Sequence, residues 1–201
     1  MKRTVVFLLA ALLLVSVTAI LPIHGEAAIY DSVIRLHVLA NSDSEEDQAL
    51  KLAVRDALLA EARVLLADVK TRDEAETILS GQLASLTDTA RETVAREGYD
   101  YPVRITLGNE EYPTRQYENL AFPAGEYLSM RVLIGQAAGQ NWWCVLFPPL
   151  CLSAATAKGE AEEAFLAAGL TGEQYRIITD SDSTKYRLRF KILEVAKELF
   201  D

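Results

Sequence analysis

The sequence predicts an α+β fold: an antiparallel sheet of four to five strands in meander order, covered by an antiparallel helix pair and followed by a C-terminal helical segment. The first observation is a series of short apolar–polar alternations between residues 103 and 147, which is typical of half-buried strands. The second is a pair of charged segments between residues 45 and 98 that carry apolar residues at helical spacing. The third is the short length of the loops between the strands, which favours antiparallel pairing of successive strands.

The first predicted strand spans Ile34 to Leu39, where apolar residues alternate with Arg35 and His37. We expect the apolar residues to face inward and the two polar side chains to share the other face. A helix should follow from about Glu45 to Asp68, because Ser44 and the residues before it offer N-caps and the first turn is acidic. The apolar stripe of this helix comprises Leu50, Val54, Leu58, Leu65 and Val69.

A second helix is predicted from Thr71 to Gly98. Thr71 and Glu74 have the spacing of a capping box, in which each side chain bonds the other residue's backbone amide. Gly98 is a suitable C-terminal stop. The residues expected to face inward are Leu79, Leu83, Leu86, Ala90 and Val94. With the first helix, this one would form the antiparallel pair that covers the sheet.

The remaining predicted elements follow the helix pair. Alternation and turn residues predict strands at Val103–Leu107, Thr114–Tyr117, Tyr127–Ile134 and Trp142–Phe147. The first of these should end at Gly108 and Asn109, and Gly135 to Gly139 should form a hairpin into the last. Further along the chain we expect a helix from Gly159 to Leu170, a short strand from Tyr175 to Thr179 and a helix from about Thr184.

The N-terminus has the pattern of an export signal. Lys2 and Arg3 precede an apolar stretch from Val5 to Leu21, and small residues stand at Gly25 and Ala27. We expect a signal peptide over residues 1–27, cleaved after Ala27, and a single α+β domain over residues 28–201. Because the apolar stretch is near the shortest length that spans a bilayer, an uncleaved anchor is the alternative. In either case the domain is expected outside the cytoplasm.

The charge balance limits the classes of partner. The chain carries 29 acidic and 20 basic residues, a formal net charge of −9. Nucleic acids and anionic lipid headgroups are bound by clustered Lys and Arg, so the composition argues against a nucleic-acid partner. The sequence has no glycine-rich phosphate-binding motif and too few His and Cys for a structural zinc site, so we expect neither a cofactor nor a metal.

His37 is the only histidine that remains after removal of the predicted signal peptide, so any histidine-dependent catalysis would use it. It lies near Asn41 and Asp43 in the sequence, and Cys144 would approach it if the strand with the tryptophans pairs with the first strand. An exported hydrolase that uses His37 with Cys144 or a carboxylate is therefore one hypothesis. The other interpretation is a strand histidine that hydrogen-bonds a neighbour, and the absence of a Gly-x-Ser-x-Gly motif favours it.

Residues 141–151 contain both tryptophans and both cysteines of the chain, together with Pro148 and Pro149. The prolines should end the strand, because proline has no amide hydrogen to donate to a sheet. A turn there would bring Cys151 near Cys144, and outside the cytoplasm the two are a candidate disulfide. The segment is either a strand end closed by a disulfide or part of a functional site, and the sequence leaves both interpretations open.

Two blocks of the sequence carry a family resemblance. The first runs from Ile34 to Ser44 and continues through Glu46–Leu52 and Val54–Asp56. The second comprises Pro123–Tyr127, Arg131–Val132, Ile134–Gly135 and Asn141–Cys151. Together they resemble stage II sporulation protein R of endospore-forming Firmicutes.

The resemblance implies a messenger with no catalytic activity of its own. Proteins of this family are made in the forespore and exported into the space that faces the mother cell. There they trigger a membrane-bound aspartic protease of the mother-cell membrane, which removes the pro-sequence of sigma-E. No small-molecule substrate is expected. An exported hydrolase and a structural envelope protein are the alternatives.

The resemblance supplies no receptor-contact residues, so we predict the contact surface from the strands. If the first strand and the strand with the tryptophans are neighbours, polar and aromatic side chains converge at one sheet edge. The predicted partner-binding residues are Arg35, His37, Asn41, Asp43, Asn141, Trp142 and Trp143.

Overall fold

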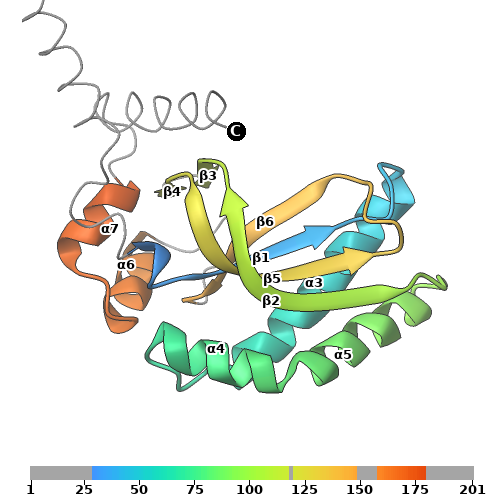
Figure 1. The fold of residues 1–201 in the computed structure, drawn as a ribbon, viewed down its shortest axis with the longest axis horizontal. Helices are drawn as coiled ribbons and strands as arrows, with labels where there is room; N and C mark the ends of the chain where they lie inside the picture. The colour runs from blue at the N-terminus through green and yellow to red at the C-terminus, as the bar shows by residue number, and fades with distance from the viewer. Residues whose placement is uncertain (1–28, 118–119, 149–157, 180–201) are drawn as a thin grey trace, which may run out of the picture.

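The computed structural model describes residues 29–117, 120–148 and 158–179, which are coloured in Figure 1. The predicted signal peptide over residues 1–27, Cys151 and the predicted helix from Thr184 lie outside the described residues. None of the helices in the described part is both long enough and apolar enough to cross a membrane.

A four-stranded sheet forms the centre of the α+β domain. Its strands are β2 (Val103–Tyr112), β5 (Gly125–Ile134), β1 (Ile34–Leu39) and β6 (Asn141–Phe147), in that spatial order. Three neighbouring pairs are formed, of which β2–β5 and β1–β6 are antiparallel and β1–β5 is parallel. The predicted fold class and the mostly antiparallel sheet are confirmed.

The predicted meander order is wrong, because β1 is inserted between β5 and β6. All six residues of β1 are buried, so this strand needs a neighbour on each edge and cover on both faces. The segment from Gly135 to Gly139 is therefore not a hairpin. It crosses the end of β1 to reach the far side of that strand (Figure 1).

Backbone and side-chain groups at the end of β1 hold this crossing segment. The amides of Ala138 and Gly139 donate to the carbonyl oxygens of Asn41 and Ala40 at 3.2 and 3.0 Å. Gly139 packs so closely that a Cβ atom there would overlap the backbone carbonyl of Ser42. A glycine is needed at that position because any side chain would push the two backbones apart.

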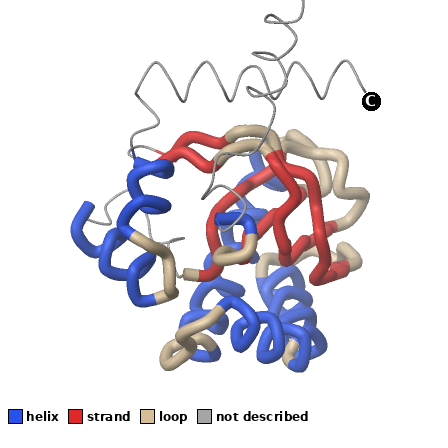
Figure 2. Tube along the Cα trace, turned by 60° about the vertical axis from the view of Figure 1, so that its left-hand side comes forward, coloured by secondary structure: helices blue, strands red, loops and turns tan. Residues whose placement is uncertain are grey.

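Helices α3 (Glu45–Leu65), α4 (Arg72–Gly81) and α5 (Leu83–Arg96) cover one face of the sheet. Figure 2 shows them as a layer against the strands, and Figure 1 shows α3 and α5 side by side in opposite directions. The predicted caps are confirmed, since Ser44 caps α3 and Thr71 forms a capping box with Glu74. The second predicted helix is broken at Gln82, next to Gly81, a residue with low helix propensity.

The main core lies between these helices and the sheet. The predicted inward-facing residues of the helices are largely confirmed: Leu50, Val54, Leu58, Leu79, Leu86, Ala90 and Val94 are buried, and Leu65, Val69 and Leu83 are partly buried against them. They pack on Leu36 and Val38 of β1 and on the apolar face of β5. Gly98, at a φ of +87°, follows the end of α5 as predicted.

A smaller core covers part of the opposite face, which we call the outer face of the sheet. It involves the hairpin of β3 (Arg115–Tyr117) and β4 (Leu120–Phe122) and the helices α6 (Lys158–Ala167) and α7 (Gly172–Thr179). The strand predicted at Thr114–Tyr117 and the helix predicted at Gly159–Leu170 are confirmed, whereas β4 was not predicted.

Two element predictions in these regions are wrong. The strand predicted to end at Gly108 continues to Tyr112, because β5 pairs with it along its whole length. Residues Tyr175–Thr179 belong to a helix and not to a strand. Tyr175 and Ile178, three positions apart, are both buried, which is the spacing of one helix face.

Candidate functional site

The outer face of the sheet carries the polar side chains of β1. Because successive residues of a strand point to opposite faces, Leu36 and Val38 enter the main core and Arg35 and His37 lie on the outer face. The prediction that β1 pairs with the strand of the tryptophans is confirmed, and His37 lies directly opposite Trp143.

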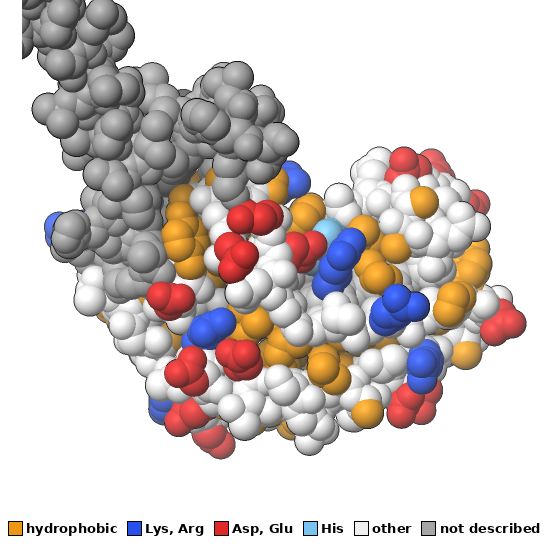
Figure 3. Space-filling model, in the orientation of Figure 1, with side chains coloured by type: hydrophobic (Ala, Val, Ile, Leu, Met, Phe, Trp, Pro, Cys, Tyr) orange, Lys and Arg blue, Asp and Glu red, His pale blue; other side chains and the backbone are white. Residues whose placement is uncertain are grey.

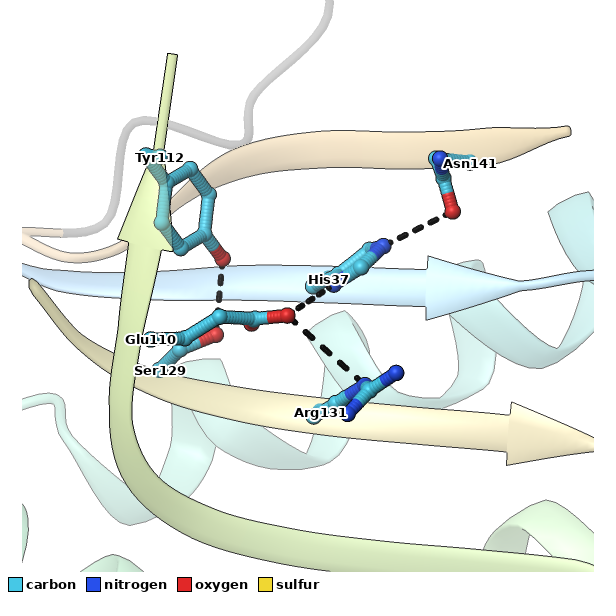
Figure 4. A network of polar contacts seen from close by, with 6 residues as sticks. All are labelled: His37, Glu110, Tyr112, Ser129, Arg131 and Asn141. Atoms are coloured by element: carbon cyan, nitrogen blue, oxygen red, sulfur yellow. Dashed lines mark hydrogen bonds and ion pairs between the residues drawn. The ribbon is translucent and has the colours of Figure 1, made fainter. Parts of the chain in front are cut away.

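His37 is held by side chains from two strands that are distant in the sequence: β6, which is next to β1, and β2, which lies beyond β5. Its Nδ1 atom lies 2.8 Å from Oε1 of Glu110, and its Nε2 atom lies 2.9 Å from Oδ1 of Asn141. Glu110 also meets the Nε atom of Arg131 at 3.7 Å, as Figure 4 shows. His37 is only 3% exposed, so its two ring nitrogens are committed to these partners.

The electrostatics of this network favour a charged carboxylate. Burial by itself would raise the pKa of Glu110, but the hydrogen bond and charge of His37, with smaller contributions from Ser129 and Arg131, hold that pKa below its ordinary value. Glu110 is therefore ionised at neutral pH. A doubly protonated His37 ring would donate to both oxygen atoms that face it.

Trp143 forms an aromatic platform above this network. His37 stacks on its ring with centroids 3.7 Å apart and an interplanar angle of 13°, and Tyr112 meets it edge-on at 4.6 Å. The guanidinium group of Arg115 lies over the same ring, 5.0 Å from the centroid. Tyr112 is fixed in turn by a hydrogen bond of 2.7 Å between its hydroxyl group and Oγ of Ser129.

Arg35 lies further along the same face and is fully buried. Its Nη2 atom donates to the hydroxyl group of Tyr117 at 2.6 Å, and its Nε atom donates to the carbonyl oxygen of Cys144 at 3.2 Å. Its guanidinium carbon lies over four aromatic rings, those of Tyr112, Tyr117, Phe122 and Tyr127, at 4.5 to 5.6 Å from their centroids. Arg35 therefore has no surface with which to touch a partner directly.

Asn41 and Asp43 have a different task at the end of β1. The Oδ1 atom of Asn41 accepts from the amide of Gln136 at 3.0 Å, and Oδ1 of Asp43 accepts from the amide of Gln140 at 2.7 Å. Both side chains thus fasten the segment that crosses β1. Their described bonds go to this segment and to the start of α3, and none goes to His37.

Trp142 is on the other face of β6 from Trp143. Its side chain is 37% exposed, and the guanidinium group of Arg55 in α3 lies 4.3 Å from its ring centroid. Of the seven predicted residues, the structure brings His37, Asn141 and Trp143 into contact and places Arg35 on the same face. Asn41 and Asp43 lie at the strand end, and Trp142 does not join the group.

Cys144 points away from His37. It pairs with Leu36 and belongs to the main core on the helix side, so the hypothesis of a Cys144–His37 catalytic pair is wrong. Its predicted disulfide with Cys151 stays a prediction, because Cys151 lies outside the described residues. Within the described part of the chain, no group of three or more His, Cys, Asp or Glu side chains is placed to hold a metal ion.

The sequence block from residue 30 to residue 157 matches the family model of stage II sporulation protein R. The chain belongs to this family. It is 37% identical over 160 residues to stage II sporulation protein R of Bacillus subtilis (strain 168). The aligned part covers 75% of this chain and 71% of that protein. No solved structure matches the chain.

Family membership supports a role in sporulation, as the resemblance of the sequence implied. The matched block contains all four strands of the central sheet and the network around His37. The sequence interpretation missed Glu110, Tyr112, Arg115 and Arg131 as members of this network. The sequence carries no alternation signal for the first two, because the apolar alternation of β2 stops at Leu107 and is followed by the exposed Asn109 and Glu111.

Proposed function

We propose that the protein is an exported intercompartmental signal that activates a membrane-bound aspartic protease of the mother-cell membrane, and so leads to the processing of pro-sigma-E. The observation that carries this proposal is the family match over residues 30–157. Its place of action would be the space between forespore and mother cell. The export pattern at the N-terminus supports that placement.

The role would be that of a ligand and not of an enzyme. A general base must present a free nitrogen to the proton that it takes. Both nitrogens of His37 instead face Glu110 and Asn141, and Trp143 stacks on the ring. This arrangement is typical of a side chain that fixes strands to one another, and it supports the proposal that catalysis resides in the partner.

The test separates activation from catalysis. Purified domain is added to membranes that contain the cognate aspartic protease and pro-sigma-E, and, separately, to pro-sigma-E and generic peptide and ester substrates without membranes. We expect cleavage only with the membranes. Turnover by the domain alone, abolished in His37→Ala, would instead support a hydrolase that uses His37 with the Glu110 carboxylate. No cleavage in either arm would support a structural envelope protein.

A further inference from the structure

The outer face of the sheet is basic in an acidic protein. Among the described strands of the sheet, alternation and register place Arg35, Arg104 and Arg131 on this face, and Arg115 reaches it from β3. Glu110 is the one acidic residue that the four strands contribute to it. The chain as a whole has a net charge of −9, so this face differs in sign from the average surface.

Several donors on this face have no partner within the described part of the chain. The Nη1 atom of Arg35 and the Nε atom of Arg115 are buried without a hydrogen bond. The hydroxyl group of Tyr117 accepts from Arg35, which leaves its own hydrogen available to a further acceptor. Buried donors are seldom left unsatisfied in folded proteins. Arg35 is fully buried, so an acceptor from outside the domain would meet the side chains of Arg115 and Tyr117, which are partly exposed.

The protonation state of Tyr117 keeps this donor in place. Burial raises the pKa of its hydroxyl group, although Arg35 and Arg115 act in the opposite direction. The hydroxyl group therefore keeps its proton at neutral pH. Arg115 and Tyr117, two residues apart in β3, present their side chains to the same side.

Around these donors the surface is open and partly apolar. Arg131 is 46% exposed, Asn141 is exposed and Trp143 is half-buried. Figure 3 shows Lys and Arg side chains next to hydrophobic ones across the middle of the molecule, with Asp and Glu side chains beside them, in the orientation of Figure 1. Partly exposed Trp and Arg side chains are the residue types that most often anchor protein partners.

We propose that the outer face from Arg115 across Trp143 to Arg131 is the docking surface for an acidic protein segment, and that a carboxylate of that segment is bound by Arg115 and Tyr117. The partner that presents the segment rests on the proposed function: it would be the extracytoplasmic part of the activated protease. The segment would lie across Trp143, with Arg131 at the rim.

The chemistry of the face favours a carboxylate of a protein over a membrane. An arginine fork and a neighbouring hydroxyl donor match the two oxygens of a carboxylate, which they bind directionally. Binding to anionic lipid needs several Lys or Arg side chains clustered near a membrane. Here Arg35 is fully buried and Arg115 is partly buried, which leaves few exposed arginines on this face for a headgroup plane.

The first experiment tests the surface without the protease. The exported domain, labelled with ¹⁵N, is titrated with a capped tetrapeptide that contains two glutamates, with its glutamine counterpart, and with phosphatidylglycerol vesicles. We expect saturable shifts at the amides of Arg115, Tyr117 and Trp143 with the glutamate peptide alone. Arg115→Gln should weaken this binding about tenfold, the loss expected for one charge-assisted hydrogen bond. Equal shifts with the glutamine peptide, shifts with vesicles alone, or no shifts would overturn the proposal.

The second experiment measures activation of the protease. Arg115→Gln and Arg131→Gln should each lower pro-sigma-E cleavage at a fixed protein concentration, while their thermal unfolding stays close to wild type. The matched control is Arg91→Gln on α5, an arginine that is 60% exposed on the helix side and should behave as wild type. Full activation by Arg115→Gln and Arg131→Gln would overturn the docking surface and leave the proposed function standing. A wild-type domain that binds the peptide but activates nothing would contradict the proposed function alone.

Discussion

Replacing His37 by phenylalanine and Glu110 by alanine, singly and together, measures how strongly the two side chains depend on each other. Phenylalanine keeps a ring to stack on Trp143 but removes both ring nitrogens. The double-mutant cycle formed by these variants therefore isolates the polar contacts. The contact between His37 and Glu110 is 2.8 Å long and lies in a mostly buried setting. Hydrogen bonds to charged groups in such settings contribute about 1.5–3 kcal/mol, and this is the expected coupling energy.

The single substitutions should differ in a predictable way. His37→Phe also removes the bond to Asn141, so it should lower the free energy of unfolding by about 3 kcal/mol, one ordinary hydrogen bond more than the coupling itself. Glu110→Ala should cost about 2 kcal/mol. Urea unfolding followed by tryptophan fluorescence gives these values by linear extrapolation. A coupling energy below about 0.5 kcal/mol would refute the assignment of His37 as a structural link between strands.

The same variants predict a pH dependence with a definite sign. The folded pKa of Glu110 lies below its ordinary value of 4.5, so the carboxylate contributes stability above that value. This contribution is lost as the pH falls through the lower, folded pKa. The difference in unfolding free energy between wild type and Glu110→Ala should therefore shrink as the pH falls below about 4.5. A difference that grows on acidification would contradict the network.

Two further substitutions test how the segment that crosses β1 is held. Asp47→Asn should lower stability by about 2–3 kcal/mol, because the buried carboxylate accepts from Asn41 and Ser42 at 2.8 and 2.5 Å. Glu46→Gln in the same helical turn is the control for the helix dipole and should lower the free energy of unfolding by less than about 1 kcal/mol in a urea titration. Equal losses of stability in the two variants would show that the hydrogen bonds of Asp47 are unimportant. Gly139→Ala should lower the free energy of unfolding by about 1–3 kcal/mol, because its Cβ atom would overlap Ser42. Gly108→Ala is the control, since a Cβ atom there meets open space. Equal melting temperatures of the two variants in calorimetry would contradict the close crossing.

The local elements of this fold were predictable because their signals are local. The capping residues Ser44 and Thr71 and the acidic first turn of α3 act within a few residues of the chain, and their predicted roles are confirmed. The order of the strands depends on which strand can be covered on all sides. A sequence reader would recognise β1 as a central strand only by assuming that Arg35 and His37 are buried, as they are in the structure. Arginine and histidine side chains are seldom fully buried, so the sequence argues against that assumption.

The partners of the two polar side chains could not be read from the sequence for the same reason. Arg35 is stabilised by aromatic rings from β2, β3, β4 and β5, and none of these residues is near it in the sequence. The contact between His37 and Glu110 spans 73 residues. It depends on β2 continuing through Gly108, which is a turn-forming residue by local preference. Pairing with β5 overrides that preference.

Burial divides the residues of the outer face into two groups, and the division changes how loss of signalling should be interpreted. Arg35 and His37 lie beneath the surface and join strands, so their alanine variants should lose stability and signalling together. Arg131 and Trp143 reach the surface and are supported from below by that network. A rigid platform of this kind lowers the entropy cost of binding, because its contact residues are already fixed before the partner arrives. Signalling lost without loss of stability is therefore expected at the exposed and partly exposed residues such as Arg115 and Arg131, and a stable but inactive His37 variant would show that this ring acts on the partner directly.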